Sequence, residues 1–249
     1  GDDVAMTNRS WRFSGHDLAK RFGWRTVRLI NDFEAVALSL PHLRADDTRP
    51  LGGGTADPEG PRVVFGPGTG LGVAALMPAA RGGSAVPTEG GHVSFGPASA
   101  DEEPVFARLR ESLGYVSSEA ILSGPGLARL HRALHGSATE TLGPADITAF
   151  AHTGDAACVA TVKLFVRLFG RFAGDLALLF RATGGVYAGG GVARRIDEFL
   201  DAPEFRTAFE AHPPYEGLLR EIPTSLITLD EPGLVGCAAL ARSLAHTPA

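Results

Sequence analysis

A layered α/β protein is the fold class predicted by the order of patterns along the chain. Short runs rich in β-branched residues alternate with longer segments of helical periodicity. With 249 residues, 44% of them hydrophobic, the chain can bury a sizeable core in one large or two small domains. No internal repeat or low-complexity tail interrupts this alternation, so we expect a globular molecule.

The individual elements follow from strand-forming runs, helical periodicity and breaker residues. Pro41 ends the first helix, and the glycines at 66–72 predict the tight turn of a hairpin. A Gly- and Pro-rich loop at 48–61 is the best candidate for a linker or domain boundary. The predicted strands are residues 25–30, 62–65, 73–77, 185–188 and 225–229. The predicted helices are residues 33–40, 102–113, 118–122, 126–134, 146–152, 155–181, 193–200 and 234–244.

The longest apolar stretch, from Val159 to Phe180, predicts a core helix and not a membrane span. Charged residues recur in it at four-residue spacing, which places them in one stripe along a helix. They are Lys163, Arg167, Arg171 and Asp175. We therefore expect no membrane partner.

Net charge and cysteine usage exclude further classes of protein and of binding site. A net charge of −5 and the lack of a Lys/Arg run oppose nucleic-acid binding. Cys158 and Cys237 are isolated, which excludes a cysteine-based zinc site, and we expect both to pack as small apolar residues inside helices. The opening Gly1 to Val4 has neither a charged nor an apolar signal region, so the sequence predicts a cytoplasmic protein.

The most informative polar segment is Thr88-Glu89-Gly90-Gly91-His92, together with Asn31-Asp32 and Ser118-Glu119. Each hydroxyl of a polyhydroxylated ligand both donates and accepts, so carboxylates, amides and imidazoles must converge on it, and glycines permit close approach. Each of these polar residues also has an interpretation that involves no ligand. These interpretations are a polar turn at 89–92, a satisfied core or turn histidine, a helix N-cap at Asn31-Asp32, and a first-turn carboxylate beside a capping Ser118.

Two glycine clusters admit a nucleotide interpretation. The segment 66–72 misses the G-x-G-x-x-G and G-K-[ST] signatures, so a dinucleotide or P-loop site is a weak hypothesis. Its backbone N–H groups and the Thr69 hydroxyl could still form an anion-binding nest, with a plain hairpin turn as the alternative. The run Gly189-Gly190-Gly191 lies between a predicted strand and helix, where glycines serve close packing or the approach of a base and ribose.

Together these strings resemble bacterial glucokinases, in the same order and over essentially the whole chain. The matching segments are residues 4–8 with Trp11, 29–34, 65–73, 89–92, 116–120, 122–127, 188–191 and 232–236. The resemblance implies a two-domain ribonuclease H-like (hexokinase/actin-like ATPase) fold with sugar and ATP in the cleft. It assigns residues 1–42 and 233–249 to a small α/β domain and 43–232 to a large one.

The resemblance also implies the roles of the site residues in ATP-dependent phosphorylation of glucose to glucose 6-phosphate. Asp32 matches the catalytic base, which accepts the proton of the 6-hydroxyl. The sugar ligands are Asn31, Asp32, Glu89, His92 and Glu119. The residues implied for ATP and its phosphates are Gly68, Thr69, Gly70, Gly189, Gly190 and Gly191. Mg²⁺ would bridge the nucleotide phosphates, with no side-chain metal ligand identified, and the family pattern suggests a homodimer.

One departure from the family pattern concerns its opening phosphate-binding turn, Asp-x-Gly-Gly-Thr. The similar Gly52-Gly53-Gly54-Thr55 does not follow an apolar strand ending in Asp, so we do not assign it as this phosphate-binding turn. We therefore expect an incomplete small domain, either because an N-terminal piece is missing from this sequence or because the product is truncated. The alternatives are an impaired sugar-binding or regulatory module, a hexose kinase for another sugar, and a dinucleotide-dependent oxidoreductase.

Overall fold

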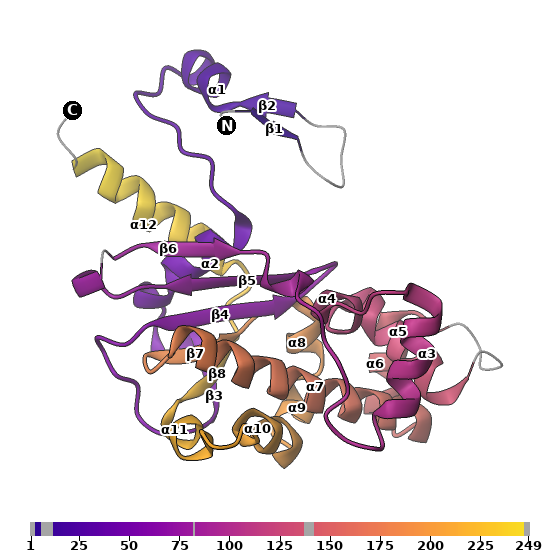
Figure 1. Cartoon of the computed structure of the whole chain (residues 1–249). Coiled ribbons are helices and arrows are strands. Elements are labelled where there is room, and N and C mark those ends of the chain that lie inside the picture. Colours follow the sequence, from indigo (N-terminus) through magenta and orange to yellow (C-terminus); the bar gives the residue numbers. More distant parts are fainter. Residues whose placement is uncertain (1–2, 6–11, 82, 137–141, 247–249) are drawn as a thin grey trace.

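A six-stranded mixed sheet forms the centre of the molecule (Figure 1). The computed structural model describes residues 3–5, 12–81, 83–136 and 142–246, so the expected motif residues 6–8 and Trp11 lie outside them. The strand order is β3-β8-β7-β4-β5-β6. Strands β4, β7 and β8 are parallel to one another, and β3, β5 and β6 run antiparallel to their neighbours. The strand bounds are β3 Thr48–Gly52, β4 Arg62–Pro67, β5 Leu71–Leu76, β6 Ala85–Thr88, β7 Gly185–Ala188 and β8 Thr224–Ile227.

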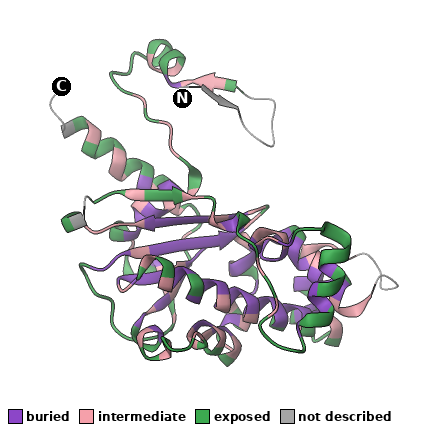
Figure 2. Cartoon of the chain, in the orientation of Figure 1, coloured by how far each residue is buried: buried purple, intermediate pink, exposed green. Residues whose placement is uncertain are grey.

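The central strand β4 is apolar without alternation because helices cover both of its faces. Val63 and Phe65 belong to the large hydrophobic cluster around α7 (Ala156–Phe180), whereas Val64 belongs to a smaller cluster beside α2 (Asp32–Ser39). The central strands are buried, while the outer strands reach the surface (Figure 2). Both edge strands carry a proline, Pro50 in β3 and Pro87 in β6, which removes a backbone donor at each edge.

Two helical layers enclose this sheet (Figure 1). Helix α7 packs with α10 (Pro203–Glu210) on one face, and α2 packs with α12 (Pro232–His246) on the other. The other helices of this body are α3 Glu103–Leu113, α4 Ser118–Ile121, α5 Gly124–His135, α6 Pro144–His152, α8 Gly191–Arg195, α9 Asp197–Leu200 and α11 Glu216–Glu221. Short 3-10 helices are η1 Leu40–His42, η2 Ala45–Asp47, η3 Ala79–Arg81 and η4 Gly90–His92.

The charged stripe of α7 is confirmed as the polar side of a core helix. Arg171 and Arg167 both contact the buried carboxylate of Glu102, at 2.7 and 3.2 Å. Of the other two members of the stripe, Lys163 forms an ion pair with Glu204, and Asp175 is hydrogen-bonded to Nε2 of His212 at 3.1 Å. Within the described ranges, no helix is long and apolar enough to cross a bilayer.

A small N-terminal lobe projects from the body (Figure 1). It consists of the antiparallel pair β1 (Asp3–Ala5) and β2 (Arg12–Ser14), followed by α1 (Gly15–Phe22). The predicted strand at 25–30 is wrong, because this segment has no strand partner among the described residues. An ion pair of 3.0 Å between Arg28 and Glu34 connects it to α2 instead.

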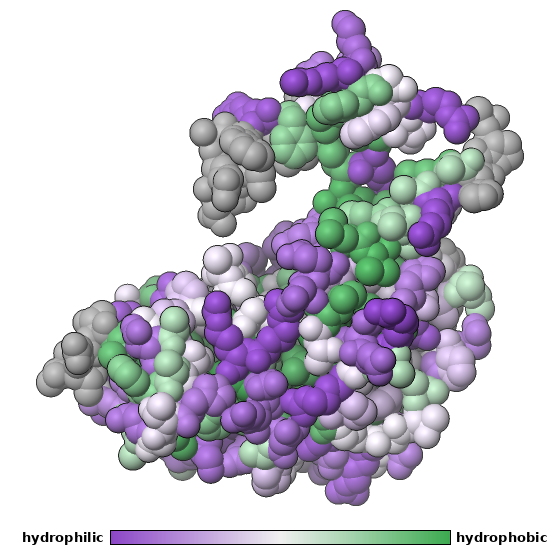
Figure 3. All heavy atoms as spheres, turned by 180° about the vertical axis from the view of Figure 1, so that it is seen from behind, coloured by the Kyte–Doolittle hydropathy of each residue, from purple (hydrophilic) through white to green (hydrophobic). Residues whose placement is uncertain are grey.

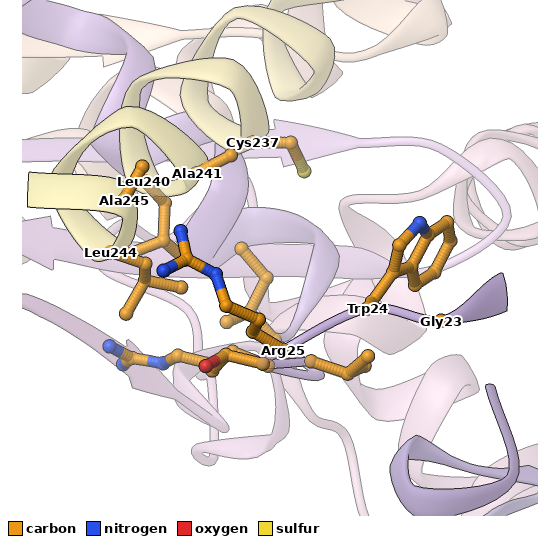
Figure 4. A pocket seen from close by; sticks show the side chains of 12 residues that line it. Gly23, Trp24, Arg25, Cys237, Leu240, Ala241, Leu244 and Ala245 are labelled. Carbon is orange, nitrogen blue, oxygen red and sulfur yellow. The ribbon is translucent and has the colours of Figure 1, made fainter. Parts of the chain in front are cut away.

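An open groove of about 1040 Å³ separates residues 23–30 from α12 (Figure 4). Trp24 and Arg25 line one side, and Leu240 and Leu244 line the other. Hydrophobic side chains gather where the lobe joins the body (Figure 3). None of the predicted site residues lines this groove.

Three further expectations need correction. The loop at 48–61 is shorter than predicted, because residues 48–52 form the edge strand β3 against β8. The helix at 193–200 divides at Ile196 into α8 and α9. The sequence patterns also missed β1, β2, α1, β6, α10 and α11, which are all short, and β6 and α10 contain proline.

The two cysteines differ in environment. Cys158 is buried in α7, where burial and then a hydrogen bond with Asp155 raise the pKa of its thiol to about 11. Cys237 is helical as expected but exposed, because the side of α12 that carries it faces the open groove. The expectation of internal packing is therefore wrong for Cys237.

These environments predict selective labelling by a thiol reagent such as dithiobis-nitrobenzoate at pH 8. Because the thiolate is the reactive species, only Cys237 should react in the folded protein, and Cys158 should react after unfolding in guanidinium. Counting the released thiolate before and after denaturation checks this. Cys237→Ser should leave no fast-reacting thiol, and two fast thiols in the native parent would contradict the assignment.

Candidate functional site

One cavity of about 280 Å³ collects all five residues that the sequence assigned to the sugar. It lies between the start of α2, the β4–β5 hairpin and the turn at 88–92. The residues predicted for the sugar that line it are Asn31, Asp32, Glu89, His92 and Glu119, and those predicted for phosphate are Gly68, Thr69, Gly70 and Gly190. The structure thus brings together segments that are up to 159 residues apart in the numbering, from Asn31 to Gly190.

The first wall of the cavity is the N-terminus of α2. Asn31 is the N-cap, and its Oδ1 accepts from the N–H groups of Phe33 at 2.8 Å and Glu34 at 3.2 Å. Asp32 is the first helical residue, and its Oδ1 also accepts from Phe33 N–H at 2.8 Å. The side-chain oxygen of Asn31 thus caps the helix. Its side-chain NH₂ group is left to donate a hydrogen bond to a ligand oxygen. Capping and ligand binding are compatible here.

The second wall is the turn that carries Glu89 and His92. The Thr88 hydroxyl donates to Val73 O and accepts from Gly90 N–H, each at 3.1 Å, which fixes the turn to β5. A side chain at Gly91 would place its Cβ 2.3 Å from Leu71 O, so this close approach requires glycine. The side chains of Glu89 and His92 are 86% and 60% exposed, with Oε2 and Nε2 3.8 Å apart. They therefore form an open polar rim.

Glu119 connects this cavity to the β4–β5 hairpin. Its Oε2 accepts from Leu71 N–H at 2.9 Å, and a Cβ at Gly70 would lie only 2.5 Å from the same oxygen. The cap of α4 is Ser117, which accepts from Ala120 N–H at 3.1 Å, and not Ser118 as the sequence suggested. Ser118 is instead buried, and its N–H donates to Val93 O.

The glycine-rich segment forms the predicted hairpin, with Pro67 opposite Leu71 in the strand register. The Gly68 N–H donates to Gly70 O at 2.8 Å within the turn, so it is already engaged. For Thr69 and Gly70, by contrast, the described residues place no acceptor on the backbone N–H. Fewer backbone N–H groups are therefore available to bind an anion than the sequence predicted, because that of Gly68 is already used.

The second glycine cluster lies directly beside the hairpin. Gly189 N–H donates to Phe65 O at 2.8 Å, and a Cβ at Gly190, whose φ is +84°, would lie 2.6 Å from Pro67 O. All three glycines, 189–191, line a second cavity of about 450 Å³ that extends toward the start of α12. Asp32 lines both cavities, as do Phe33 and Gly190, so it lies where the two cavities adjoin.

The sequence did not reveal the structural roles of three residues of the site. Thr88 anchors the turn, Tyr115 fixes it by donating to His92 O at 3.0 Å, and the Phe33 ring lies against the hairpin. A serine or threonine whose hydroxyl accepts from the N–H two residues later is a recognised turn pattern, so Thr88 could have been found. Tyr115 and Phe33 act through long-range contacts that leave no local signal.

The described part of the chain contains no group of three or more His, Cys, Asp or Glu side chains arranged to hold a metal ion. The carboxylates of the smaller cavity, those of Asp32, Glu89 and Glu119, come from three separate segments. The arrangement suits hydrogen bonding to a ligand rich in hydroxyl groups, with an anion-binding turn beside it.

Comparison with known proteins identifies the family of this chain. Glucokinases of Yersinia enterocolitica and Tolumonas auensis are 42% and 43% identical to it over 246 residues, which cover 97% of this chain and 76% and 77% of theirs. The crystal structure of a glucokinase from an Antarctic psychrotroph superposes with a TM-score of 0.91 at 33% identity, covering 98% of this chain and 77% of that one. These neighbours have the actin-like ATPase fold. The glucokinase family model matches residues 1–244, and the chain therefore belongs to the glucokinase family.

Proposed function

We propose that Asp32 is the general base for the glucose phosphorylation of this family, in the cavity between α2, the β4–β5 hairpin and the turn at 88–92. The observation that carries the proposal is the position of Asp32 on the wall shared by both cavities. A sugar in the smaller cavity and a nucleotide in the larger one would meet at this carboxylate.

The chemical task of such a site is positioning and charge neutralisation, since phosphoryl transfer passes through a loose transition state. Asp32 accepts the proton of the 6-hydroxyl as that oxygen attacks the terminal phosphorus of ATP, and the bond to the ADP oxygen breaks. Asn31, Glu89, His92 and Glu119 hold the remaining hydroxyls. The N–H groups of Thr69 and Gly70 bind phosphate oxygens on the far side.

Mg²⁺ is proposed to enter with the nucleotide. Mg²⁺ at nucleotide sites is usually carried mainly by phosphate oxygens and water. When bound, it would neutralise phosphate charge during transfer.

Solved relatives support the choice of ligands. A glucokinase from Balamuthia mandrillaris was crystallised with glucose, and a ROK-family glucokinase from Streptomyces griseus with glucose and AMPPNP. Their chains share the fold of this one, with TM-scores of 0.76 and 0.61. We propose the same two ligand classes for the two adjoining cavities.

We further propose a cytoplasmic homodimer, organised as a small domain of residues 1–42 and 233–249 and a large domain of residues 43–232. Packing of α12 on α2 supports the grouping of the first and last segments. Exposed apolar side chains such as Leu179 and Phe150 are available to an interface on the larger part.

His92→Ala should raise the KM for glucose about tenfold with a smaller effect on kcat. A hydroxyl ligand contributes binding that the ground and transition states share, so its loss appears mainly in KM. Initial rates over a glucose titration at saturating MgATP measure both constants. His42→Ala, an exposed histidine on η1 away from the cavity, is the matched control. A collapse of kcat with unchanged KM would contradict the assigned role.

A further inference from the structure

Two glycines on opposite strands form a slot that the ring of Phe33 fills. Gly66 and Gly72 are register partners in the β4–β5 pair, and such partners point to the same face of a sheet. A Cβ added at Gly72 would lie 1.8 Å from Cδ2 of Phe33, and one at Gly66 would lie 2.7 Å from the backbone carbon of Gly189 and 3.0 Å from Cζ of Phe33. The ring therefore occupies the space of a side chain at Gly72 and, together with the Gly189 backbone, that of one at Gly66.

The backbone of Phe33 holds both polar residues at the start of α2. Its N–H donates to Oδ1 of Asn31 and to Oδ1 of Asp32, each at 2.8 Å. A continuous set of contacts thus runs from the hairpin strands, through the Phe33 ring and its backbone N–H, to the Asp32 carboxylate. The same hairpin carries the Thr69-Gly70 turn.

The remainder of this hairpin face shows that the slot is local. Val64 and Ala74, two residues farther from the turn on the same face, are buried and belong to the cluster that α2 covers. Side chains on the hairpin fill the space there, whereas at Gly72 the space is left to the Phe33 ring and at Gly66 it is shared by that ring and the Gly189 backbone. Phe33 also lines both cavities, so it borders both proposed ligand sites.

We infer that Phe33 is a positioning residue, which sets the location of the Asp32 carboxylate relative to the Thr69-Gly70 turn. This inference rests on the proposed role of Asp32 as general base. Because phosphoryl transfer depends on alignment of base, hydroxyl and phosphate, a small displacement of Asp32 should reduce turnover more than sugar affinity.

Phe33→Leu tests the inference, since a smaller apolar side chain fills the slot incompletely. We expect kcat to fall at least tenfold, with the KM for glucose within about threefold of the parent, because the Asn31 cap remains. Phe209→Leu, at a fully buried site between α10 and α7, is the matched control. It should lower the Tm and leave kcat per folded molecule unchanged, which separates positioning from general core filling.

A pair of substitutions that compensate for each other distinguishes positioning from a simple loss of packing. Gly72→Ala should reduce kcat because its methyl group displaces the Phe33 ring, and Phe33→Ala added to it should restore part of the lost rate. Circular dichroism gives the folded fraction of each variant. Parent-like kcat in Phe33→Leu, or no rescue in the double variant, would overturn the inference.

Asp32→Asn measured in parallel separates the two ideas. A fast Asp32→Asn enzyme would refute the proposed base, and the role of Phe33 with it. If Asp32→Asn has a strongly reduced kcat and Phe33→Leu has the kcat of the parent, only the positioning role of Phe33 is refuted.

Discussion

Asp32→Asn is expected to reduce kcat by a factor on the order of 10²–10⁴ while glucose still binds, because it removes the proton acceptor and little else. Asparagine has nearly the same shape, and Asn31, not Asp32, is the N-cap of α2. The free energy of unfolding should therefore remain within about 1 kcal/mol of the parent. Glucose-dependent release of ADP measures kcat, and calorimetric titration measures glucose affinity.

Two controls make this result specific. Asn31→Asp retains a capping oxygen but loses the NH₂ group, so its defect should appear mainly in sugar affinity. Glu34→Gln changes a neighbouring carboxylate of the same helix that pairs with Arg28 outside both cavities. A kcat for Asp32→Asn within about threefold of the parent would show that the residue is a first-turn carboxylate and not the base.

Gly236→Ala should cause a larger loss of stability than a methyl group added at any other glycine that the structure describes. A Cβ at this position would lie 1.8 Å from Ala35 O and 3.0 Å from Ser39 N, both backbone atoms of α2. Neither can move without shifting the helix that begins at Asp32. Overpacking typically costs 1–3 kcal/mol, and a backbone clash belongs at the upper end, at about 3 kcal/mol.

Gly233→Ala, one turn earlier on α12, is the matched control for this prediction. Its Cβ would lie 3.7 Å from the Ala35 Cβ, which is an ordinary contact. Urea denaturation of both variants should show a large decrease in unfolding free energy for Gly236→Ala and little change for Gly233→Ala. Equal stability of the two variants would contradict the close packing of α12 on α2.

The elements that sequence patterns predicted correctly have local causes. The β4–β5 hairpin follows from turn glycines between two apolar runs, and α2 follows from the Asn31 cap and Pro41. The polar stripe of α7 follows from four-residue spacing alone, and each of its charges does find a partner.

The errors arise where a distant partner decides the structure. Residues 25–30 have strand-like composition, yet only a paired neighbour makes a strand, and the described residues supply none. Conversely, β3 contains Pro50 and ends at Gly52, and it forms because β8 leaves an edge that tolerates these residues. Cys237 is exposed because one side of α12 faces the open groove.

For the candidate site, the sequence predicted the residue types and missed the contacts among them. Asn31, Glu89 and Glu119 could be selected because their motifs match those of a family. Nothing in those motifs indicates that Gly68 N–H is occupied within its own turn, or that Glu119 binds Leu71 N–H. The slot for Phe33 depends on the register that places Gly66 opposite Gly72.

The most direct test of the central claim is phosphorus NMR of the protein incubated with glucose and MgATP. The proposed function predicts glucose 6-phosphate and ADP in equal amounts, with the sugar phosphate formed far more slowly by Asp32→Asn at the same protein concentration. Glucose binding without any sugar phosphate would contradict it and identify a sugar-binding module. Release of ADP and inorganic phosphate alone would also contradict it, because the hydroxyl of glucose would then not be the acceptor.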